Sequence, residues 1–335
     1  SGKTVLIETL MGLHLFSGGK VFINDMEVSQ LPPEQRQVAY LPQDYGLFPH
    51  LGVKDNVLFG ARARKFPKEL MEQRLKEVSN LLEIMHLLTR PNVSTLSGGE
   101  RQRIAMARAL IFEPAILFLD EPFAAIDENL KRQLQKKLRE IKTNLGITIF
   151  HVTHDHHEAY YLGDKIGVIL SGKLHQVGTQ GDLYHNPQSI EVADFLLTRN
   201  IFFGVVCEIF NGGTEVLVEV GKRRIRAHPS KSVHVGQNVV IGIRPEEIKI
   251  DPVPKDWKVC DESDCNAMLG KIVSRSELFG NFSFESEGDS LRPNLEIDVM
   301  KTRVCRDDLV TGAPVKVCLS KKALWILPNE NLEKT

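Results

Sequence analysis

The sequence predicts an α/β domain followed by an all-β region. Strand-like and helix-like segments alternate through the first two-thirds of the 335 residues, which is typical of a mainly parallel sheet covered by helices. After about residue 200, short alternating strands follow one another between glycine, proline and aspartate turns. A chain of 335 residues also exceeds what one hydrophobic core usually serves. We therefore expect an α/β domain over residues 1–200 and β modules over residues 201–335, with a linker between two such modules at 251–258.

The first elements follow from their apolar patterns. A short apolar helix is expected over Val5–His14, and strands are expected over Lys20–Asp25 and Gln37–Gln43. A mostly helical stretch follows between residues 53 and 95, interrupted by two prolines.

The next elements have clearer limits. The segment Ala115–Leu119 is an unbroken apolar run followed by carboxylates, which predicts a buried strand with polar groups at its C-terminal end. Asp127 precedes leucines at helical spacing and is the expected N-cap of a helix. Another apolar strand, GITIFHVTH, follows that helix and also ends in polar residues.

Bulk composition disfavours several function classes. The formal net charge is −1, so the average charge gives no reason to expect nucleic acid or an anionic membrane surface as a partner. No apolar run approaches the roughly 18 residues of a membrane-spanning helix. All five cysteines lie beyond residue 200, and their odd number predicts a reduced, intracellular chain.

Cys260 and Cys265 flank acidic residues in the segment CDESDC. Two neighbouring thiolates can bind a soft metal ion, but no second ligand pair with zinc-like spacing accompanies them. A polar loop with two incidental thiols is the simpler interpretation.

The chain opens on Ser1, Gly2, Lys3 and Thr4, directly ahead of the first expected helix. This order is the second half of a phosphate-binding loop, in which backbone N–H groups and a helix N-terminus surround phosphate oxygens. Lys3 would contact the β- and γ-phosphates of a nucleotide, and the Thr4 hydroxyl would bind Mg²⁺. The four residues alone do not decide the matter, because such a turn before a helix also occurs by chance.

A second anion-binding pattern lies at Leu96–Leu110, LSGGERQRIAMARAL. Ser97, Gly98 and Gly99 begin a helix, so they present bare N–H groups and a hydroxyl to an anion, supported by the helix dipole. A glycine-rich helix start does not account for the whole string. The string resembles the signature motif of ATP-binding cassette (ABC) ATPases, which implies a P-loop NTPase domain with a helical subdomain and ATP as its ligand.

Other segments resemble the motifs of this family in the same order. ILFLDEP is similar to the Walker B strand, which implies that Asp120 binds Mg²⁺ and that Glu121 is the general base for the attacking water. Carboxylates buried at a strand end are costly without a metal or polar partner, so a purely structural role explains this pair poorly. His154, in HVTHD, resembles the switch histidine that contacts the γ-phosphate.

Gln43 and Asp127 complete the set of motif residues. Gln43, in LPQDYGLFPHL, resembles the Q-loop glutamine, which implies contact with Mg²⁺ and the attacking water. Asp127 ends the segment AAID, which resembles the D-loop, although the usual Ser-Ala-Leu-Asp has lost its hydroxyl here and its contact across the dimer is in doubt. In this family the segment from Gln43 to Gly60 helps to form the groove that receives a permease helix.

The resemblance continues through the C-terminal part. GKLHQVGTQGDLYHNPQSIEVADFL resembles the segment that closes the ATPase domain of importer subunits. GIRPEEIKI, at Gly242–Ile250, resembles the OB-type, transport-associated β domain that follows it. The family therefore implies an ABC ATPase domain over residues 1–200 and an OB-like β region over residues 201–335.

The resemblance also implies partners. Two copies of the chain would pack head to tail as a homodimer, with each ATP between the phosphate loop of one copy and the signature motif of the other. Two integral-membrane permease subunits would form the transport path, an external solute-binding protein would act indirectly, and no nucleic acid is involved. We thus expect the chain at the cytoplasmic face of the cell membrane, held there by the permeases.

The transported solute is inferred by analogy. LPQDYGLFPHL and FLLTRNIFFG most resemble ATPases of molybdate, tungstate and sulfate-type oxyanion importers. Importers of sugars, polyamines and ferric iron share the architecture and stay open as alternatives. A soluble ABC ATPase of nucleic-acid metabolism or translation is disfavoured because tandem cassettes and zinc modules are lacking. A non-hydrolysing regulatory subunit is disfavoured because the motif residues are intact.

The family normally places further strands, an adenine-stacking aromatic residue and the first loop glycines ahead of Ser1. We interpret the start of the sequence as a cut through the nucleotide site. The 335-residue chain as written is therefore expected to bind ATP poorly.

Overall fold

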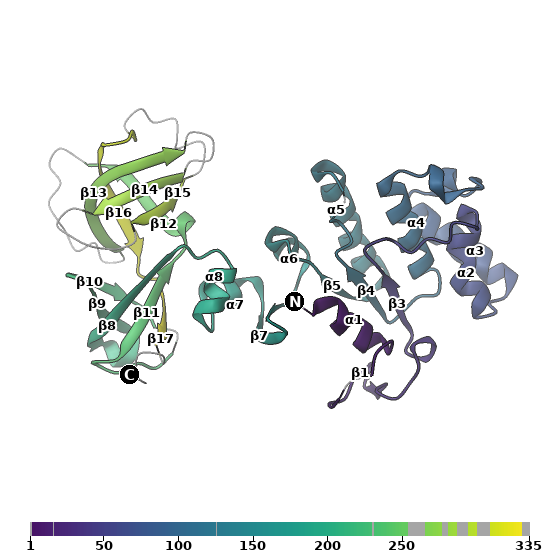
Figure 1. The fold of residues 1–335 in the computed structure, drawn as a ribbon, viewed down its shortest axis with the longest axis horizontal. Coiled ribbons are helices and arrows are strands. Elements are labelled where there is room, and N and C mark those ends of the chain that lie inside the picture. The colour runs from purple at the N-terminus through teal and green to yellow at the C-terminus, as the bar shows by residue number, and fades with distance from the viewer. Residues whose placement is uncertain are drawn as a thin grey trace. The chain divides into compact units, whose positions relative to one another are not determined.

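The computed structural model describes residues 2–15, 17–124, 126–229, 231–253, 265–276, 281–286, 294–299 and 309–329. It divides into two compact units, drawn in Figure 1. Unit 1 comprises Ser1–Asp164 and Ile169–Gly172, and unit 2 comprises Lys165–Val168 and Lys173–Thr335.

Unit 1 is built on a three-stranded parallel sheet in the order β3 (Val38–Leu41), β4 (Ile116–Asp120), β5 (Thr148–Val152). Leu41 pairs with Leu119, and Asp120 pairs with Val152, so the three strands end at one edge of the sheet. The residues that follow these strands are therefore brought together, as is usual for parallel sheets.

Helices cover both faces of this sheet. The described helices of unit 1 are α1 (Lys3–Met11), α2 (Val53–Ala63), α3 (Lys68–Leu81), α4 (Gly98–Leu110), α5 (Glu128–Leu145) and α6 (His156–Leu162). On one face, Ile7 and Met11 of α1 pack against Phe118 of β4. Leu117 and Leu119 alternate with Phe118 and therefore point to the other face, where they share a core with α2–α5. Figure 1 shows α2, α3 and α4 gathered together on one side of the unit.

The helix predicted over Val5–His14 is α1, which begins earlier and ends earlier than its apolar pattern indicates. It ends because Gly12 has φ 88°, a conformation that glycine adopts readily. A Cβ atom at Gly12 would also lie 2.7 Å from the guanidinium of Arg36. This crowded, left-handed position stops the helix before His14.

The described residues also form shorter elements in both units. They are β1 (Phe22–Ile23), β2 (Met26–Glu27), β6 (Ile166–Leu170), β7 (Lys173–Gly178), α7 (Gln180–His185), α8 (Ile190–Phe195) and 3₁₀ turns at Pro33–Gln35, Met85–Leu87, Val93–Thr95, Asn211–Gly213 and Pro245–Glu247. β1 pairs with β2, and β6 pairs with β7.

The described residues of unit 2 form two five-stranded antiparallel sheets. The first has the order β10 (Arg223–Ala227), β9 (Glu215–Val220), β8 (Asn200–Phe210), β11 (Asn238–Ile243), β17 (Trp325–Pro328). The second has the order β12 (Ile248–Pro252), β16 (Pro314–Ser320), β13 (Cys265–Ser276), β14 (Asn281–Ser286), β15 (Leu295–Asp298). One hydrophobic core includes residues of both sheets. The predicted fold class, α/β followed by all-β, is confirmed.

The first residues of the linker expected at 251–258 lie in a strand. Asp251 and Pro252 belong to β12 and pair with β16. Residues 254–264, which include Cys260, lie outside the described part of the chain.

The expectation of a fully reduced chain is wrong for one pair of cysteines. Cys265 of β13 and Cys318 of β16 form a disulfide, with their Cα atoms 5.8 Å apart. The two strands are neighbours in one sheet, and Ala267 lies opposite Cys318, which brings the two thiols together. Cys207 is a free thiol. Cys265 is therefore engaged and is not a thiolate ligand in this state.

Among the described residues, no helix combines the length and apolar character needed to cross a membrane.

Candidate functional site

The start of α1 offers unpaired backbone donors. Gly2 is its N-cap, with φ 76°, and its carbonyl accepts the first helical bond from Leu6 at 3.0 Å. The first N–H groups of any helix lack partners within the helix and carry the positive end of its dipole. Lys3 and Thr4 thus stand where an anion is favoured. Ser1 lies outside the described residues.

Lys3 reaches from α1 to the segment that follows β5. Its Nζ donates to the carbonyl oxygen of Thr153 at 3.0 Å. Lys3 and the loop that carries His154 are therefore in direct contact, although they are far apart in sequence.

Asp120 ends β4 with a side chain that is almost completely buried. The residue is 5% exposed, and its Oδ2 accepts a long hydrogen bond of 3.5 Å from the hydroxyl of Tyr40. Burial and the neighbouring Asp120 charge raise the pKa of Tyr40 to about 12, so its phenol stays protonated and can donate at neutral pH. Sequence reasoning missed Tyr40. The signal that could have found it is the phenol hydroxyl of a tyrosine within the otherwise apolar strand Val38–Leu41.

Glu121 follows Asp120 in a left-handed backbone conformation, with φ 46°. A non-glycine residue in this conformation is strained, and such strain concentrates at functional sites. Its N–H still donates to the Val152 carbonyl at 2.9 Å, so the start of the turn is fixed to β5. Its side chain is 29% exposed, in contrast to buried Asp120.

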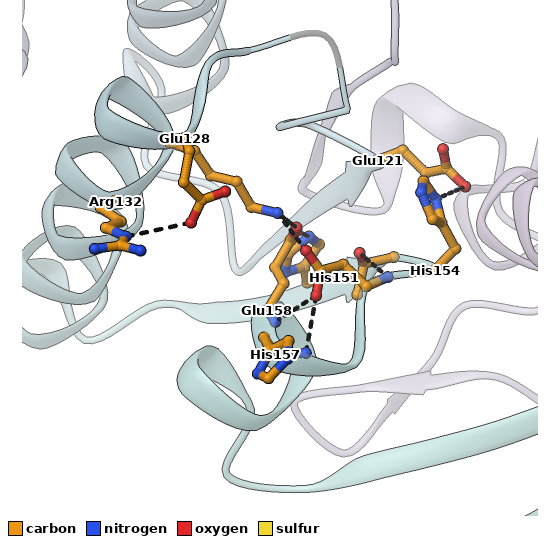
Figure 2. Close-up of polar contacts among 10 residues, drawn as sticks. Glu121, Glu128, Arg132, His151, His154, His157 and Glu158 are labelled. Carbon is orange, nitrogen blue, oxygen red and sulfur yellow. Dashed lines mark hydrogen bonds and ion pairs between the residues drawn. The ribbon is translucent and has the colours of Figure 1, made fainter. Parts of the chain in front are cut away.

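His154 lies opposite Glu121, as Figure 2 shows. Its Nδ1 is 3.2 Å from Oε1 of Glu121, and its side chain is 69% exposed. A solvent-accessible histidine–carboxylate pair contributes little to stability. The pair is instead placed where a bound molecule and a water could reach both groups.

Gln43 follows β3 in an exposed turn, at the same edge of the sheet. The segment after it is held by α4, because the Arg108 guanidinium donates to the carbonyls of Tyr45 and Gly46 at 2.9 and 2.7 Å. Arg108 also lies over the ring of Phe48, 5.0 Å from its centroid. One residue of the signature helix therefore fixes the shape of the loop after Gln43.

The signature segment starts α4 with a reciprocal cap. The Ser97 hydroxyl accepts from the Glu100 N–H at 3.2 Å, and the Glu100 carboxylate accepts from the Ser97 N–H at 2.7 Å. That backbone hydrogen bond to Ser97 lowers the pKa of Glu100. Ser97 and Gly98 are exposed, whereas Gly99 is buried.

Gly99 and Asp127 both lie beside the start of α5. Asp127 is the N-cap of that helix, as predicted, and accepts from the Leu130 N–H at 3.0 Å. A Cβ atom at Gly99 would lie 2.5 Å from Cδ2 of Leu130. Only a glycine lets the two helix starts approach this closely.

The site residues therefore form two groups. Lys3, Asp120, Glu121 and His154 lie at the edge of the sheet with Thr4 and Gln43. Ser97, Gly98 and Gly99 lie at the start of α4, and Asp127 caps α5, whose Leu130 lies beside Gly99. Within the described parts of the chain, the structure records no hydrogen bond or ion pair between the two groups.

Comparison with known proteins identifies the family. A family model described as ABC transporter matches residues 1–124. The chain is 38% identical to the molybdate/tungstate import ATP-binding protein WtpC of Pyrococcus abyssi over 312 residues, which cover 92% of this chain and 83% of that relative. This chain belongs to the ABC transporter family.

Two further relatives belong to the same family. The WtpC protein of Thermococcus kodakarensis is 40% identical over 254 residues, covering 76% of this chain and 73% of the relative. The spermidine/putrescine import ATP-binding protein PotA of Clostridioides difficile is 39% identical over 249 residues, covering 74% of this chain and 70% of the relative. The chain is thus an ATP-binding protein and an ATPase of the ABC transporter type.

The residues at the sheet edge also suit a magnesium ion that accompanies ATP. Asp120 supplies a buried carboxylate with one long protein hydrogen bond, and Thr4 and Gln43 supply neutral oxygens. Oxygen donors of this kind, completed by phosphates and water, are what Mg²⁺ prefers. The described residues contain no cluster of three or more His, Cys, Asp and Glu side chains that could hold a metal by itself.

Proposed function

We propose that this chain is the ATP-hydrolysing subunit of an importer that takes up an oxyanion such as molybdate, tungstate or sulfate. Two findings together support the proposal. The relatives named for molybdate/tungstate import cover most of the chain, and an accessible Glu121–His154 pair stands beside Lys3 and buried Asp120.

The proposed chemistry divides the work among these side chains. Gly2, Lys3 and Thr4 bind phosphate oxygens through backbone N–H groups, the ammonium and the hydroxyl. Asp120, Thr4 and Gln43 hold the magnesium ion, which supplies charge that offsets the phosphates. Glu121 takes a proton from the attacking water, and His154 contacts the γ-phosphate and orients the Glu121 carboxylate.

The second group of residues acts on the nucleotide of another copy. In a head-to-tail homodimer, Ser97, Gly98, Gly99 and Asp127 would face the ATP that the partner's phosphate loop holds. The exposed start of α4 supports this role, because Ser97 and Gly98 are exposed there and the first N–H groups of a helix lack partners within the helix.

The proposed docking site for the two permease subunits lies between Gln43 and Gly60. Phe59 is exposed there, and its ring is 4.4 Å from that of Phe48. This location would hold the ATPase domain, residues 1–200, at the cytoplasmic face of the membrane. The β region, residues 201–335, and an external solute-binding protein complete the proposed assembly.

The solute is tested by transport. The full-length gene product would be purified with its permease subunits, reconstituted into vesicles with the binding protein, and assayed for ATP-dependent uptake. We expect uptake of molybdate or tungstate, and none without ATP.

A polyamine importer is the second candidate, because relatives named for spermidine/putrescine import have similar identity. Uptake of spermidine without uptake of any of the three oxyanions would replace the oxyanion proposal by this one.

A further inference from the structure

A cluster of four charged or ionisable side chains lies beside the loop that carries His154. It consists of Lys131 on α5, His151 on β5, and Asp155 and Glu158 at the start of α6. Figure 2 labels His151 and Glu158 of this set. The side chains of Glu158, His151 and Lys131 are 4%, 11% and 14% exposed. We call these four residues the switch-loop cluster.

Lys131 is the centre of this cluster. Its Nζ donates to Oδ2 of Asp155 and lies 3.3 Å from Oε2 of Glu158. The other oxygen of Glu158 lies 2.6 Å from Nε2 of His151, outside hydrogen-bond geometry. One ammonium therefore joins α5 to α6, and Glu158 extends the connection to β5.

The ammonium stays charged in this position. Burial by itself lowers the pKa of Lys131, but the hydrogen bond to Asp155 and the charge of Glu158 outweigh it, so the net shift is upward. The side chain of Glu158 is only 4% exposed and needs such a counter-charge, because an unpaired buried charge is costly, whereas that of Asp155 is 30% exposed.

The cluster also holds the backbone on the C-terminal side of His154. Oδ1 of Asp155 accepts from the N–H groups of His157 and Glu158 at 2.8 and 3.2 Å, which caps α6. On the N-terminal side, the carbonyl of Thr153 accepts from Lys3. The ring of His154 is itself largely exposed, so its position depends on the backbone held on both sides.

We propose that Lys131 is a positioning residue. Its contacts with Asp155 and Glu158 hold the loop that carries His154, so that His154 stays against Glu121. The inference rests on the proposed roles of Glu121 and His154. Lys131 neither touches nucleotide nor exchanges a proton. The neighbouring residue Leu130 packs over Gly99, so the same turn of α5 also sets the start of the signature helix.

The test compares three substitutions in the full-length gene product. Lys131→Met keeps the aliphatic stem and removes the charge, and Lys131→Arg keeps the charge. Lys137→Met is the matched control, because Lys137 lies on the same helix and pairs with Glu83 and Glu140 instead. Steady-state ATP hydrolysis is measured at a temperature where circular dichroism shows every variant folded. If Lys131→Met does not fold, Asp155→Asn takes its place, since asparagine can still cap α6.

We expect Lys131→Met to lower kcat about tenfold or more with KM for ATP changed less than about twofold, because a small misplacement of a catalytic group acts on the chemical step. Lys131→Arg should recover most of kcat, and Lys137→Met should match the unaltered protein. Hydrogen exchange without nucleotide should be faster at the His157 and Glu158 amides in Lys131→Met alone.

An unchanged kcat in Lys131→Met would overturn the inference whatever its hydrogen exchange, as would equal losses of kcat in Lys137→Met. Glu121→Gln is assayed in parallel, to separate a failure of the proposed catalytic site from a failure of the inference about Lys131. Full hydrolysis in that variant would refute the proposed site and the inference together. Loss of ATP hydrolysis in Glu121→Gln, together with an unchanged kcat in Lys131→Met, would refute the inference alone.

Discussion

Nδ1 of His154 lies 3.2 Å from Oε1 of Glu121, across the ends of the neighbouring strands β5 and β4. Because this ring is exposed and His154 is proposed to contact the γ-phosphate, His154→Ala should lower kcat for ATP hydrolysis by about 100-fold. Phosphate release by the full-length gene product measures the effect. His157→Ala, three residues along the chain and also exposed, is the control and should leave kcat unchanged. Equal activity of the two variants would remove His154 from the mechanism.

Gly99 is required by its contact with Leu130. In Gly99→Ala, the new Cβ would lie 2.5 Å from Leu130 Cδ2, so the side chain or the helix start must move. We expect a loss of about 1–3 kcal/mol in the free energy of unfolding, measured in urea. Gly98→Ala is the control, since no atom lies within 4 Å of a Cβ there.

The same contact can be tested by shortening its partner. Adding Leu130→Ala to Gly99→Ala should cost less than the sum of the two single changes, because the clash is removed. Additive losses would show that Gly99 matters for another reason.

The helix α1 is held at its C-terminal end by a buried arginine. The Arg36 guanidinium donates to backbone carbonyls at Leu10, Ser29 and Leu31. Arg36→Met should lower the free energy of unfolding by about 3 kcal/mol, because buried acceptors lose charged donors. Arg132→Met removes an exposed ion pair with Glu128 and should change it by less than about 1 kcal/mol. Similar values for the two variants would contradict the assigned role of Arg36.

Much of the fold follows from local patterns. The apolar run before Asp120 is β4, and the helix that Asp127 was expected to cap is α5. Both depend on residues next to one another in sequence, where propensity and capping are decisive. The sequence also predicts that Asp120, Glu121 and His154 lie at one edge of the sheet, because the C-terminal ends of parallel strands lie at the same edge.

Contacts between distant segments could not be predicted in this way. The Cys265–Cys318 disulfide depends on which strands become neighbours, and β13 and β16 are far apart in sequence. The bond of Lys131 to Asp155 and Glu158 depends on how α5 lies beside α6. A single sequence contains no local signal for either arrangement.

The reciprocal cap at the signature helix predicts a dependence on pH. The backbone hydrogen bond to Ser97 lowers the pKa of Glu100 in the folded chain, so its stabilising effect is fully present above the unfolded value and lost as pH falls through the folded one. Glu100→Ala should cost about 1 kcal/mol of unfolding free energy at pH 7. The difference between the two proteins should shrink in urea titrations as the pH falls below about 4. A difference that stays constant over this range would contradict the ionised cap.

The central claim is that Glu121 is the general base of ATP hydrolysis in this chain. Its most direct test is Glu121→Gln in the full-length gene product, assayed for steady-state hydrolysis and for ATP retained on the protein. Glu113→Gln, an exposed glutamate bonded to Arg74, is the matched control. We expect Glu121→Gln to abolish turnover and to retain bound, unhydrolysed ATP, whereas the control behaves as the unaltered protein does. Unchanged steady-state hydrolysis in Glu121→Gln would contradict this role of Glu121.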